Sequence, residues 1–595
     1  MMDDDNRNID QWRALWQQPE AAIEQLLTRQ RALLAAKEAG GAAEWIHLAT
    51  IPELQAQIDA LKDSTPDDLP LYGVPYAVKD NIDVAGMPTT AACPEFAHTP
   101  TDDAFVVAKL RAAGAICLGK TNLDQFATGL NGTRTPYGIP VNPFNEDYVP
   151  GGSSSGSAVA VSLGAAAFSL GTDTAGSGRV PAGFNRLVGL KPTRGLISTS
   201  GVLPACRSLD CVSIFAHSIG DAERVLAVAG SFDPADPYGR PAPEQRPTLT
   251  GTPRLATFAP IEWFGDTIQQ AAWQTWRDGL AAQGIELAEI DPTPFLALAP
   301  LLYGGPWVAE RLAALETFAA EQPEAIHPVV RQIVLSGKNY SAVDTFKAEY
   351  QRMALVRQIH DALAPFDALV VPTSPTFPTV AAMLAEPIQR NSELGHYTNF
   401  VNLSDLSALA IPANPRSDGL PFGVTLIGKT WADSLLADIG RALTGETVSP
   451  DTPPKPLSKG EIAVAVVGAH LSGMPLNHQL TSRGGRLLQA TTTAPSYRLY
   501  ALANTTPPKP GLVFDPAGAA IIVEVWALPR PALADFLEEI PAPLGLGTLS
   551  LADGTEVTGF VCEPRALEGA AEVTSFGGWR AYIQSLKTAA GAKHV

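Results

Sequence analysis

A run of glycine, serine and small apolar residues from Val149 to Pro181 constrains this chain more than any other stretch. It opens with a glycine-serine turn at Gly151–Gly156, continues through a short apolar segment and ends at Ser177, a serine between two glycines. Glycine permits backbone angles that other residues avoid. The two glycines before Ser153 and the two around Ser177 therefore allow both serines to occupy unusual, closely packed backbone.

A lysine lies upstream of these serines in the apolar run Val78-Lys79-Asp80-Asn81. A serine hydroxyl is a poor nucleophile until a base removes its proton, and lysine replaces histidine as that base in Ser-Lys arrangements. The pKa of lysine is ordinarily about 10.4, and burial among apolar neighbours lowers it. One lysine and two serines thus predict an amide-bond hydrolase that works without histidine, in which the second serine relays the proton.

The turn Thr174-Ala175-Gly176-Ser177 can direct successive backbone N–H groups toward one point. Such a cluster of donors forms an oxyanion hole. Each motif alone has a simpler interpretation, because GGSSSG also occurs in flexible loops and a lysine in a strand often lies at a sheet edge. The run is not a phosphate loop, since no Gly-Lys-Ser/Thr follows it. The joint pattern favours a catalytic site.

Composition excludes several other functions. The formal charge of −19 opposes a nucleic-acid surface or an anionic membrane. The five cysteines are scattered and show no CxxC spacing, which favours a reducing cytosol over a disulfide framework. The acidic start lacks the features of a signal peptide, and no uninterrupted apolar stretch approaches about 18 residues. We expect a soluble, cytoplasmic protein that needs no metal or other cofactor.

The length of 595 residues predicts several domains. We expect a helical N-terminal segment over 1–65, with helix through most of 10–62, and an α/β catalytic domain over 66–445. A proline-rich linker is predicted over 446–460 and a second, smaller α/β domain over 461–595. Strands are expected at Ala115–Gly119, Ala166–Gly171, Ala368–Pro372 and Gly423–Gly428, and, in the second domain, at Ile462–Val467, Tyr497–Leu502, Ala520–Leu528 and Val557–Cys562.

The blocks VPYAVKDNID, GGSSSGSAVAV and GTDTAGSGRVPAGFNRLVGLKPT closely resemble the amidase signature family. The resemblance extends over about 70–445 and implies the amidase signature fold, a mixed central β-sheet flanked by helices. It also implies roles: Ser177 is the nucleophile, Ser153 the bridging serine in a non-proline cis peptide, and Lys79 the base. The implied oxyanion hole is the backbone of Thr174, Ala175 and Gly176, with Ala175 where the family commonly has glycine.

Two residues bear on the substrate. Tyr303 and Arg311 are eight residues apart, so they share a face if the segment is helical, and an arginine there could clamp a carboxylate. The simpler alternative is a core tyrosine and a surface arginine. The C-terminal region, including VAVVGAHLSGMPLNHQL and IIVEVWALP, resembles the second domain of bacterial allophanate hydrolases. That resemblance implies that Tyr303 and Arg311 bind the substrate carboxylate and that Gly129 makes a further contact.

By the same resemblance, allophanate is hydrolysed to ammonia and N-carboxycarbamate, and the second domain, with a γ-glutamyl cyclotransferase-like fold, promotes decarboxylation. His470, in the GAHLSG loop after a strand, is our candidate for that step, because a histidine can protonate or orient a dicarboxylate. The alternative is a histidine that only packs. The acidic residue of the cyclotransferases has no secure counterpart, so neither Glu538 nor Glu539 is assigned, and His478 is expected to be structural.

Three alternatives stay open at this point. The chain could hydrolyse malonamate-like or other small amides, it could be a tRNA-dependent amidotransferase subunit, or its C-terminal domain could be a non-catalytic dimerisation module. The favoured interpretation adds functional coupling to a biotin-dependent urea carboxylase and a homodimer, which the N-terminal helices could mediate.

Overall fold

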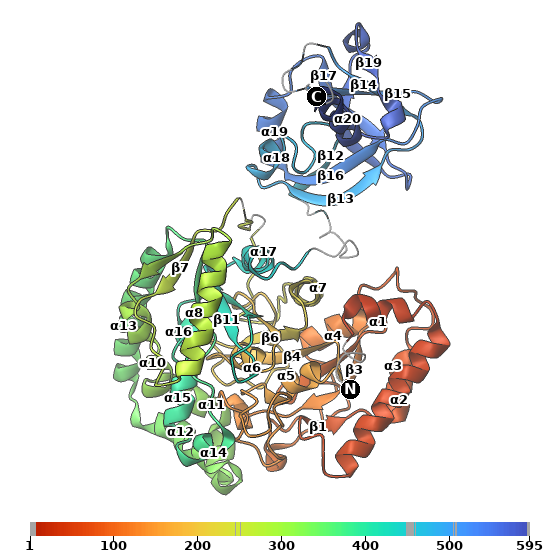
Figure 1. The fold of residues 1–595 in the computed structure, drawn as a ribbon. Coiled ribbons are helices and arrows are strands. Elements are labelled where there is room, and N and C mark those ends of the chain that lie inside the picture. The colour runs from red at the N-terminus through yellow and green to blue at the C-terminus, as the bar shows by residue number, and fades with distance from the viewer. Residues whose placement is uncertain are drawn as a thin grey trace. The chain divides into compact units, whose positions relative to one another are not determined.

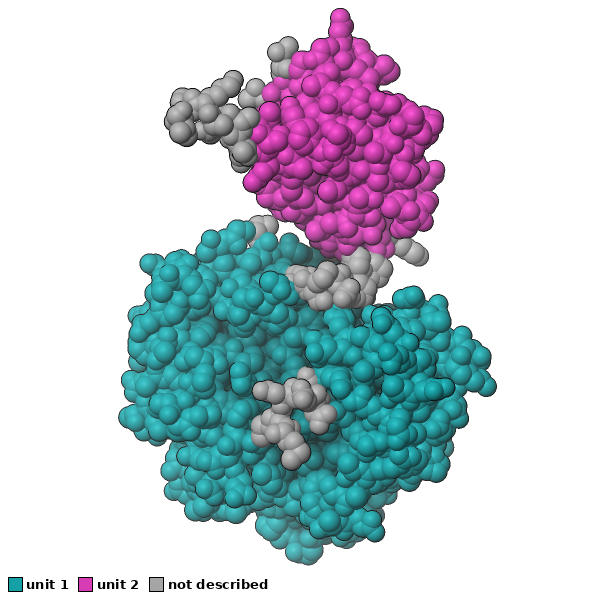
Figure 2. Space-filling view, turned by 45° about the vertical axis from the view of Figure 1, so that its right-hand side comes forward, with its two compact units in different colours: residues 1–452 teal, residues 453–595 magenta. Residues whose placement is uncertain are grey.

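The computed structural model describes residues 7–243, 246–249, 251–447, 457, 460–503, 505 and 508–591. The chain forms two compact units, residues 1–452 and 453–595, which are coloured separately in Figure 2. Most of the linker predicted over 446–460 lies outside the described residues. Within the described part of the chain, no helix is both long enough and apolar enough to cross a membrane.

The described part of the first unit is built on an eleven-stranded sheet (Figure 1). Three strands near one edge run parallel, the strands in the middle of the sheet pair antiparallel, and a second parallel group lies at the other edge, so the predicted mixed sheet is confirmed. In spatial order the strands are β1 (Trp45–Leu48), β3 (Ile116–Thr121), β2 (Pro75–Lys79), β4 (Phe168–Asp173), β6 (Cys211–Ala216), β5 (Val188–Lys191), β10 (Ser407–Pro412), β11 (Gly423–Gly428), β9 (Ala368–Pro372), β7 (Leu255–Phe258) and β8 (Leu287–Ile290).

Helices flank this sheet. They are α1 (Ile9–Leu15), α2 (Pro19–Glu38), α3 (Ile51–Asp59), α4 (Phe105–Ala112), α5 (Ser155–Ser162), α6 (Val180–Phe184), α7 (Ile219–Ala229), α8 (Thr267–Ala282), α9 (Thr293–Leu298), α10 (Leu301–Gly304), α11 (Trp307–Glu321), α12 (Pro328–Leu335), α13 (Ala342–Leu363), α14 (Val380–Ala385), α15 (Gln389–Leu394), α16 (Phe400–Leu403) and α17 (Asp433–Thr444).

Both faces of the central strands are buried. Successive side chains of a strand point to opposite faces, and in β6 Ile214 joins the core beneath α7 and α17, whereas Phe215 packs against α5 and α6 on the other face. In β10, Leu409 joins the same core as Ile214, and Ala410 packs with Phe215 on the opposite face. Strands covered on both faces contain few charged residues, which explains why these strands were recognisable in the sequence.

The N-terminal segment is not helical throughout, so that prediction is wrong for one stretch. Gly40 and Gly41 follow the end of α2, and Trp45–Leu48 then forms β1, which pairs antiparallel with β3 at the sheet edge. Glycine at a helix end and an aromatic or β-branched run after it favour a strand. Ile9, Trp12 and Leu26 are buried in the main core, so these helices are part of the first unit.

The second unit contains two sheets and its own hydrophobic core. The five-stranded sheet has the order β13 (Arg486–Thr492), β16 (Ile522–Pro529), β12 (Glu461–Val466), β18 (Glu556–Cys562) and β17 (Leu544–Ser550). The three-stranded sheet comprises β15 (Pro510–Phe514), β14 (Tyr497–Ala501) and β19 (Ala571–Glu572), and the helices are α18 (His478–Thr481), α19 (Arg530–Glu538) and α20 (Trp579–Gly591). The predicted second α/β fold is confirmed.

Candidate active site

Lys79 is the last residue of β2 and is fully buried between β3 and β4. Its Nζ donates hydrogen bonds to Ser153 Oγ at 2.8 Å and to Thr172 Oγ1 at 2.7 Å. Burial lowers the pKa of Lys79 to about 7, although the carboxylates of Asp124, Asp210 and Asp173 oppose that shift. An amine with this pKa is substantially neutral at physiological pH, as a general base must be.

Ser153 follows a cis peptide bond between Gly152 and Ser153. Only glycine fits before it, because a Cβ on Gly152 would lie 2.1 Å from Asp124 Oδ2 and 2.6 Å from the backbone nitrogen of Gly132. The same Asp124 carboxylate accepts N–H bonds from Asn131, Gly132 and Arg134 at 3.0–3.2 Å. Asp124 thus fixes the loop that packs against the serine turn.

The loop Thr174–Ser177 follows β4 and is buried. Within the described residues, the backbone N–H groups of these four positions donate to no protein acceptor. Gly176 has φ +142, and a Cβ there would lie 2.4 Å from Thr398 Oγ1. Four neighbouring amides without acceptors are chemically suited to stabilising a developing oxyanion.

Buried ionic contacts hold this loop at both ends. Asp173, just before it, binds Arg179 through two 2.9 Å bonds and accepts the N–H of Gly178 at 3.0 Å. Burial raises the pKa of Asp173, but Arg179, Lys191 and the N–H of Gly178 together outweigh this effect and the net shift is downward. At Thr174, the hydroxyl donates to Asp210 at 2.5 Å. The loop is therefore fixed before any substrate arrives, as oxyanion stabilisation requires.

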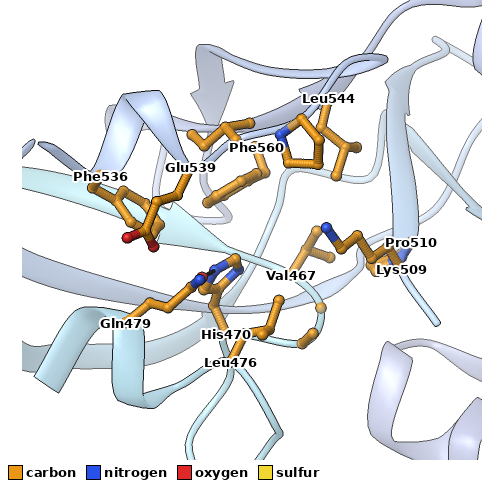
Figure 3. A pocket seen from close by; sticks show the side chains of 14 residues that line it. Val467, His470, Leu476, Gln479, Lys509, Pro510, Phe536, Glu539, Leu544 and Phe560 are labelled. Carbon is orange, nitrogen blue, oxygen red and sulfur yellow. Dashed lines mark hydrogen bonds between the residues drawn. The ribbon is translucent and has the colours of Figure 1, made fainter. Parts of the chain in front are cut away.

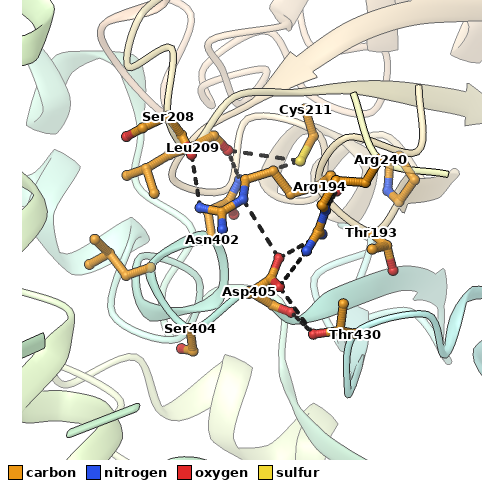
Figure 4. A network of polar contacts seen from close by, with 12 residues as sticks. Thr193, Arg194, Ser208, Leu209, Cys211, Arg240, Asn402, Ser404, Asp405 and Thr430 are labelled. Atoms are coloured by element: carbon orange, nitrogen blue, oxygen red, sulfur yellow. Dashed lines mark hydrogen bonds and ion pairs between the residues drawn. The ribbon is translucent and has the colours of Figure 1, made fainter. Parts of the chain in front are cut away.

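A wider polar network supports the same loop (Figure 4). Asn402 donates to the carbonyl oxygen of Asp173 at 2.8 Å and to that of Leu209 at 3.0 Å. Asp405, three residues later, accepts two bonds from Arg240 at 2.8 and 2.9 Å. Asn402, in α16, is therefore bonded to the end of β4, although the two are far apart in the sequence.

Ser177 is buried at the end of this loop. Its hydroxyl donates to the carbonyl oxygen of Gly129 at 3.4 Å, and among the described residues no hydrogen bond joins Ser177 to Ser153. Gly129, which was predicted to contact substrate, is thus next to the serine. A Cβ there would lie 2.4 Å from Asp124 Oδ2.

Tyr303 and Arg311 lie together, although on two helices. Gly305 and Pro306 separate α10 from α11, and Arg311 Nη2 still lies 3.4 Å from Tyr303 OH, with its guanidinium 5.0 Å from the ring centroid. Arg311 is 2% exposed, Nη1 donates to Thr128 Oγ1 at 3.1 Å, and Nε has no partner. Within the described chain, no carboxylate forms an ion pair with Arg311. Because buried charges are ordinarily paired, this one is suited to binding an anionic ligand.

His470 lies in the second unit, in the loop after β12, where it lines a cavity of about 170 Å³ (Figure 3). Its Nε2 bonds Gln479 Oε1 at 2.7 Å, and its ring stacks on Phe560 with centroids 5.0 Å apart. Burial lowers the pKa of His470. Glu539 also lines the cavity, whereas Glu538 does not, and His478 is exposed at the start of α18.

Sequence reasoning missed several residues that shape the first site, namely Thr172, Thr128, Asp124, Asp210 and the pair Asp173–Arg179. The strand order β3-β2-β4, which brings Thr172 to Lys79, has no local signal. Asp173 and Arg179 flank the predicted loop, and their opposite charges could have identified them. Among the described residues, no group of three or more His, Cys, Asp or Glu side chains is arranged to hold a metal ion.

Comparison with known proteins agrees with this geometry. Residues 31–437 match the Amidase family model, and residues 462–584 match the Allophanate hydrolase C-terminal domain. The chain is 44% identical over 576 residues to urea amidolyase of Saccharomyces cerevisiae, covering 91% of this chain and 31% of that protein. It is 34% identical over 425 residues to a glutamyl-tRNA(Gln) amidotransferase subunit of Symbiobacterium thermophilum, covering 66% of this chain and 86% of that subunit.

The structure also matches that of Kluyveromyces lactis allophanate hydrolase, with a TM-score of 0.83, 40% identity and coverage of 98% of this chain and 99% of that one. Fold and site together define an amidohydrolase with a buried lysine and glycine-flanked serines. The chain belongs to the amidase family, and its second unit is an allophanate hydrolase C-terminal domain. The resemblance inferred from the sequence is confirmed.

Proposed function

We propose that this amidohydrolase acts on allophanate, a small amide that carries one carboxylate. The main support is the buried guanidinium of Arg311, which contacts Thr128 and Tyr303 and, among the described residues, forms no ion pair with a carboxylate. Thr128 precedes Gly129, whose carbonyl oxygen accepts from the Ser177 hydroxyl. An anion bound at Arg311 is therefore held close to the proposed nucleophile. Similarity to urea amidolyase and allophanate hydrolase supports the same substrate.

The first reaction is supported by the Lys79–Ser153 hydrogen bond and by membership of the amidase family. Neutral Lys79 takes the proton of Ser153, Ser153 takes that of Ser177, and Ser177 Oγ attacks the terminal amide carbon. The amides of Thr174–Ser177 stabilise the oxyanion, and ammonia leaves with a returned proton. Water then cleaves the acyl-enzyme, so that H₂N–CO–NH–CO₂⁻ and H₂O give NH₃, HN(CO₂⁻)₂ and H⁺.

The amide substrate is tested by ammonia release from allophanate, biuret, malonamate and acetamide. We expect kcat/KM for allophanate to exceed that for acetamide by at least about 10²-fold, because acetamide has no carboxylate for Arg311. Faster hydrolysis of malonamate than of allophanate would favour the malonamate-like alternative. The similarity to the amidotransferase subunit covers 66% of this chain, whereas residues 462–584 match the Allophanate hydrolase C-terminal domain, which disfavours a tRNA-dependent function.

The second unit is proposed to decarboxylate the product HN(CO₂⁻)₂, with His470 supplying the proton to nitrogen. The half-buried imidazole, which lines a small cavity together with both apolar and ionisable side chains, supports this role. His470→Gln should leave the first ammonia release unchanged and slow CO₂ release by about 10–100-fold. The exposed His478→Gln is the matched control. If His470→Gln releases CO₂ at the wild-type rate, then His470 only packs.

Two partners are proposed. One is a urea-carboxylating enzyme that supplies allophanate, since the chain matches only 31% of the length of urea amidolyase.

The other proposed partner is a second copy of the chain. Four apolar side chains of α13, 55–69% exposed, recur at helical spacing on one stripe: Val343, Phe346, Tyr350 and Met353. Light scattering should give a dimer for the wild type and a monomer for Phe346→Ser combined with Tyr350→Ser; a dimer in both would exclude this surface.

A further inference from the structure

The cavity of the second unit has the size and chemistry of a site for a very small ligand. Its volume of about 170 Å³ lies below the roughly 300–1,000 Å³ of sites for drug-sized molecules. Val467, Phe536, Leu544 and Phe560 contribute apolar walls. Its ionisable lining groups are His470, Glu539 and Lys509 (Figure 3).

Lys509 is the lining group of this cavity whose charge is not paired within the described residues. It immediately precedes β15, and its ammonium end points into the cavity (Figure 3). Within the described chain, its side chain makes neither a hydrogen bond nor an ion pair. Glu539, in contrast, is bonded to Arg483 at 2.5 Å. The positive charge of Lys509 also acts on His470, because it is one of the causes that lower the pKa of that imidazole.

We propose that Lys509 is the anion-binding residue of this cavity and holds one carboxylate of a small dicarboxylate while His470 faces the central atom. The inference rests on the proposed function and deepens it. The second carboxylate then lies against Phe560 and its apolar neighbours. A lysine ammonium binds a carboxylate as a point charge without needing a planar fork, which suits a ligand of only a few heavy atoms.

This arrangement explains which bond breaks. In HN(CO₂⁻)₂ the C–N bond to the carboxylate at the apolar wall breaks, its electron pair stays on nitrogen, and the proton on His470 passes to that nitrogen. The products are CO₂ and H₂N–CO₂⁻, which stays bound to Lys509. An apolar wall disfavours a carboxylate and accepts neutral CO₂, so the cavity favours the transition state over the ground state.

Malonate binding to the full chain tests the site. The probe is the ¹³Cε1 NMR signal of His470, assigned from its loss in His470→Gln. We expect Lys509→Met to raise the Kd for malonate at this signal by at least about tenfold, because a charge-assisted hydrogen bond is lost. Lys509→Arg should stay within about threefold, since it keeps the charge. Arg565→Met, which removes an exposed cation outside the cavity lining, is the control.

Kinetics separate this inference from the proposed function. With ¹³C-carboxyl allophanate, Lys509→Met should leave the first ammonia release unchanged and slow ¹³CO₂ release at least about tenfold. If the wild type does not hydrolyse allophanate, the proposed function fails while malonate binding still tests the cavity. If allophanate is hydrolysed but malonate leaves the His470 signal unmoved, or Lys509→Met binds malonate as tightly as the wild type, the inference alone is overturned.

Discussion

Replacement of Lys79 with methionine should lower kcat for amide hydrolysis by about 10⁶-fold, as removal of the general base does in a serine protease. Methionine fills a similar volume but cannot accept the proton of Ser153. Steady-state ammonia release measures the loss. The variant should fold, because the folded-state pKa of Lys79 lies below its unfolded value and burying this lysine therefore costs more free energy as the pH falls from about 10.5 toward 7. Its Tm at pH 7 should be no lower than that of the wild type.

The pH profile of kcat/KM gives a second test of Lys79 as the base. The base must be neutral, so kcat/KM should rise through pH 7 and level off above it, following the pKa of about 7. Burial raises the pKa of Asp210 to about 6, so this neighbour titrates on the same acidic side. Asp210→Asn is the control that separates the two groups. Because the Asp210 carboxylate raises the pKa of Lys79, an acidic limb that belongs to Lys79 should persist in Asp210→Asn and move to lower pH. An acidic limb that disappears in Asp210→Asn, or a profile flat from pH 5 to 9, would contradict the role of Lys79.

Replacement of Arg311 with glutamine should lower kcat/KM for allophanate by about 10³-fold, the loss expected when one partner of a desolvated charge pair is removed. Hydrolysis of acetamide should change by less than about threefold, because a neutral amide makes no use of the guanidinium. The comparison of the two substrates is the measurement. Stability should not fall, since the variant removes a buried cation that has no ion-pair partner in the described chain.

Two further variants sharpen this comparison. Tyr303→Phe removes only the phenol beside Arg311 and should cost about tenfold with allophanate. Arg311→Lys keeps the charge but not the planar fork, so it should recover part of the activity. Equal losses on allophanate and acetamide in Arg311→Gln would show that the arginine shapes the site and does not recognise the carboxylate.

Much of the fold could be predicted from local sequence patterns. Gly423–Gly428 and Ala368–Pro372 are strands with the predicted bounds, because strands buried on both faces form short apolar runs between turns. Trp45–Leu48 was missed because four residues between helices give too short a pattern to distinguish. The strand order could not be predicted from local sequence patterns, because it depends on which distant segments pair.

The residues of the site also fall into two groups, those in local sequence motifs and those brought in by distant contacts. Lys79, Ser153 and the loop before Ser177 lie in motifs where glycine and small residues leave a local signature. Thr172, Asp124 and Asp210 act through contacts formed only in the folded sheet, and single aspartates and threonines carry no distinguishing pattern. Lys509 was missed for a different reason: an isolated lysine beside prolines is typical of a surface loop, and only the cavity gives it a chemical setting.

The bond from Asn402 to the carbonyl oxygen of Asp173 has a consequence for biosynthesis. When the glycine-serine block leaves the ribosome, the residue that anchors the end of β4 has still to be translated, more than two hundred codons downstream. A nascent chain released before that point would contain the glycine-serine block and Ser177, while the loop Thr174–Ser177 lacked this anchor.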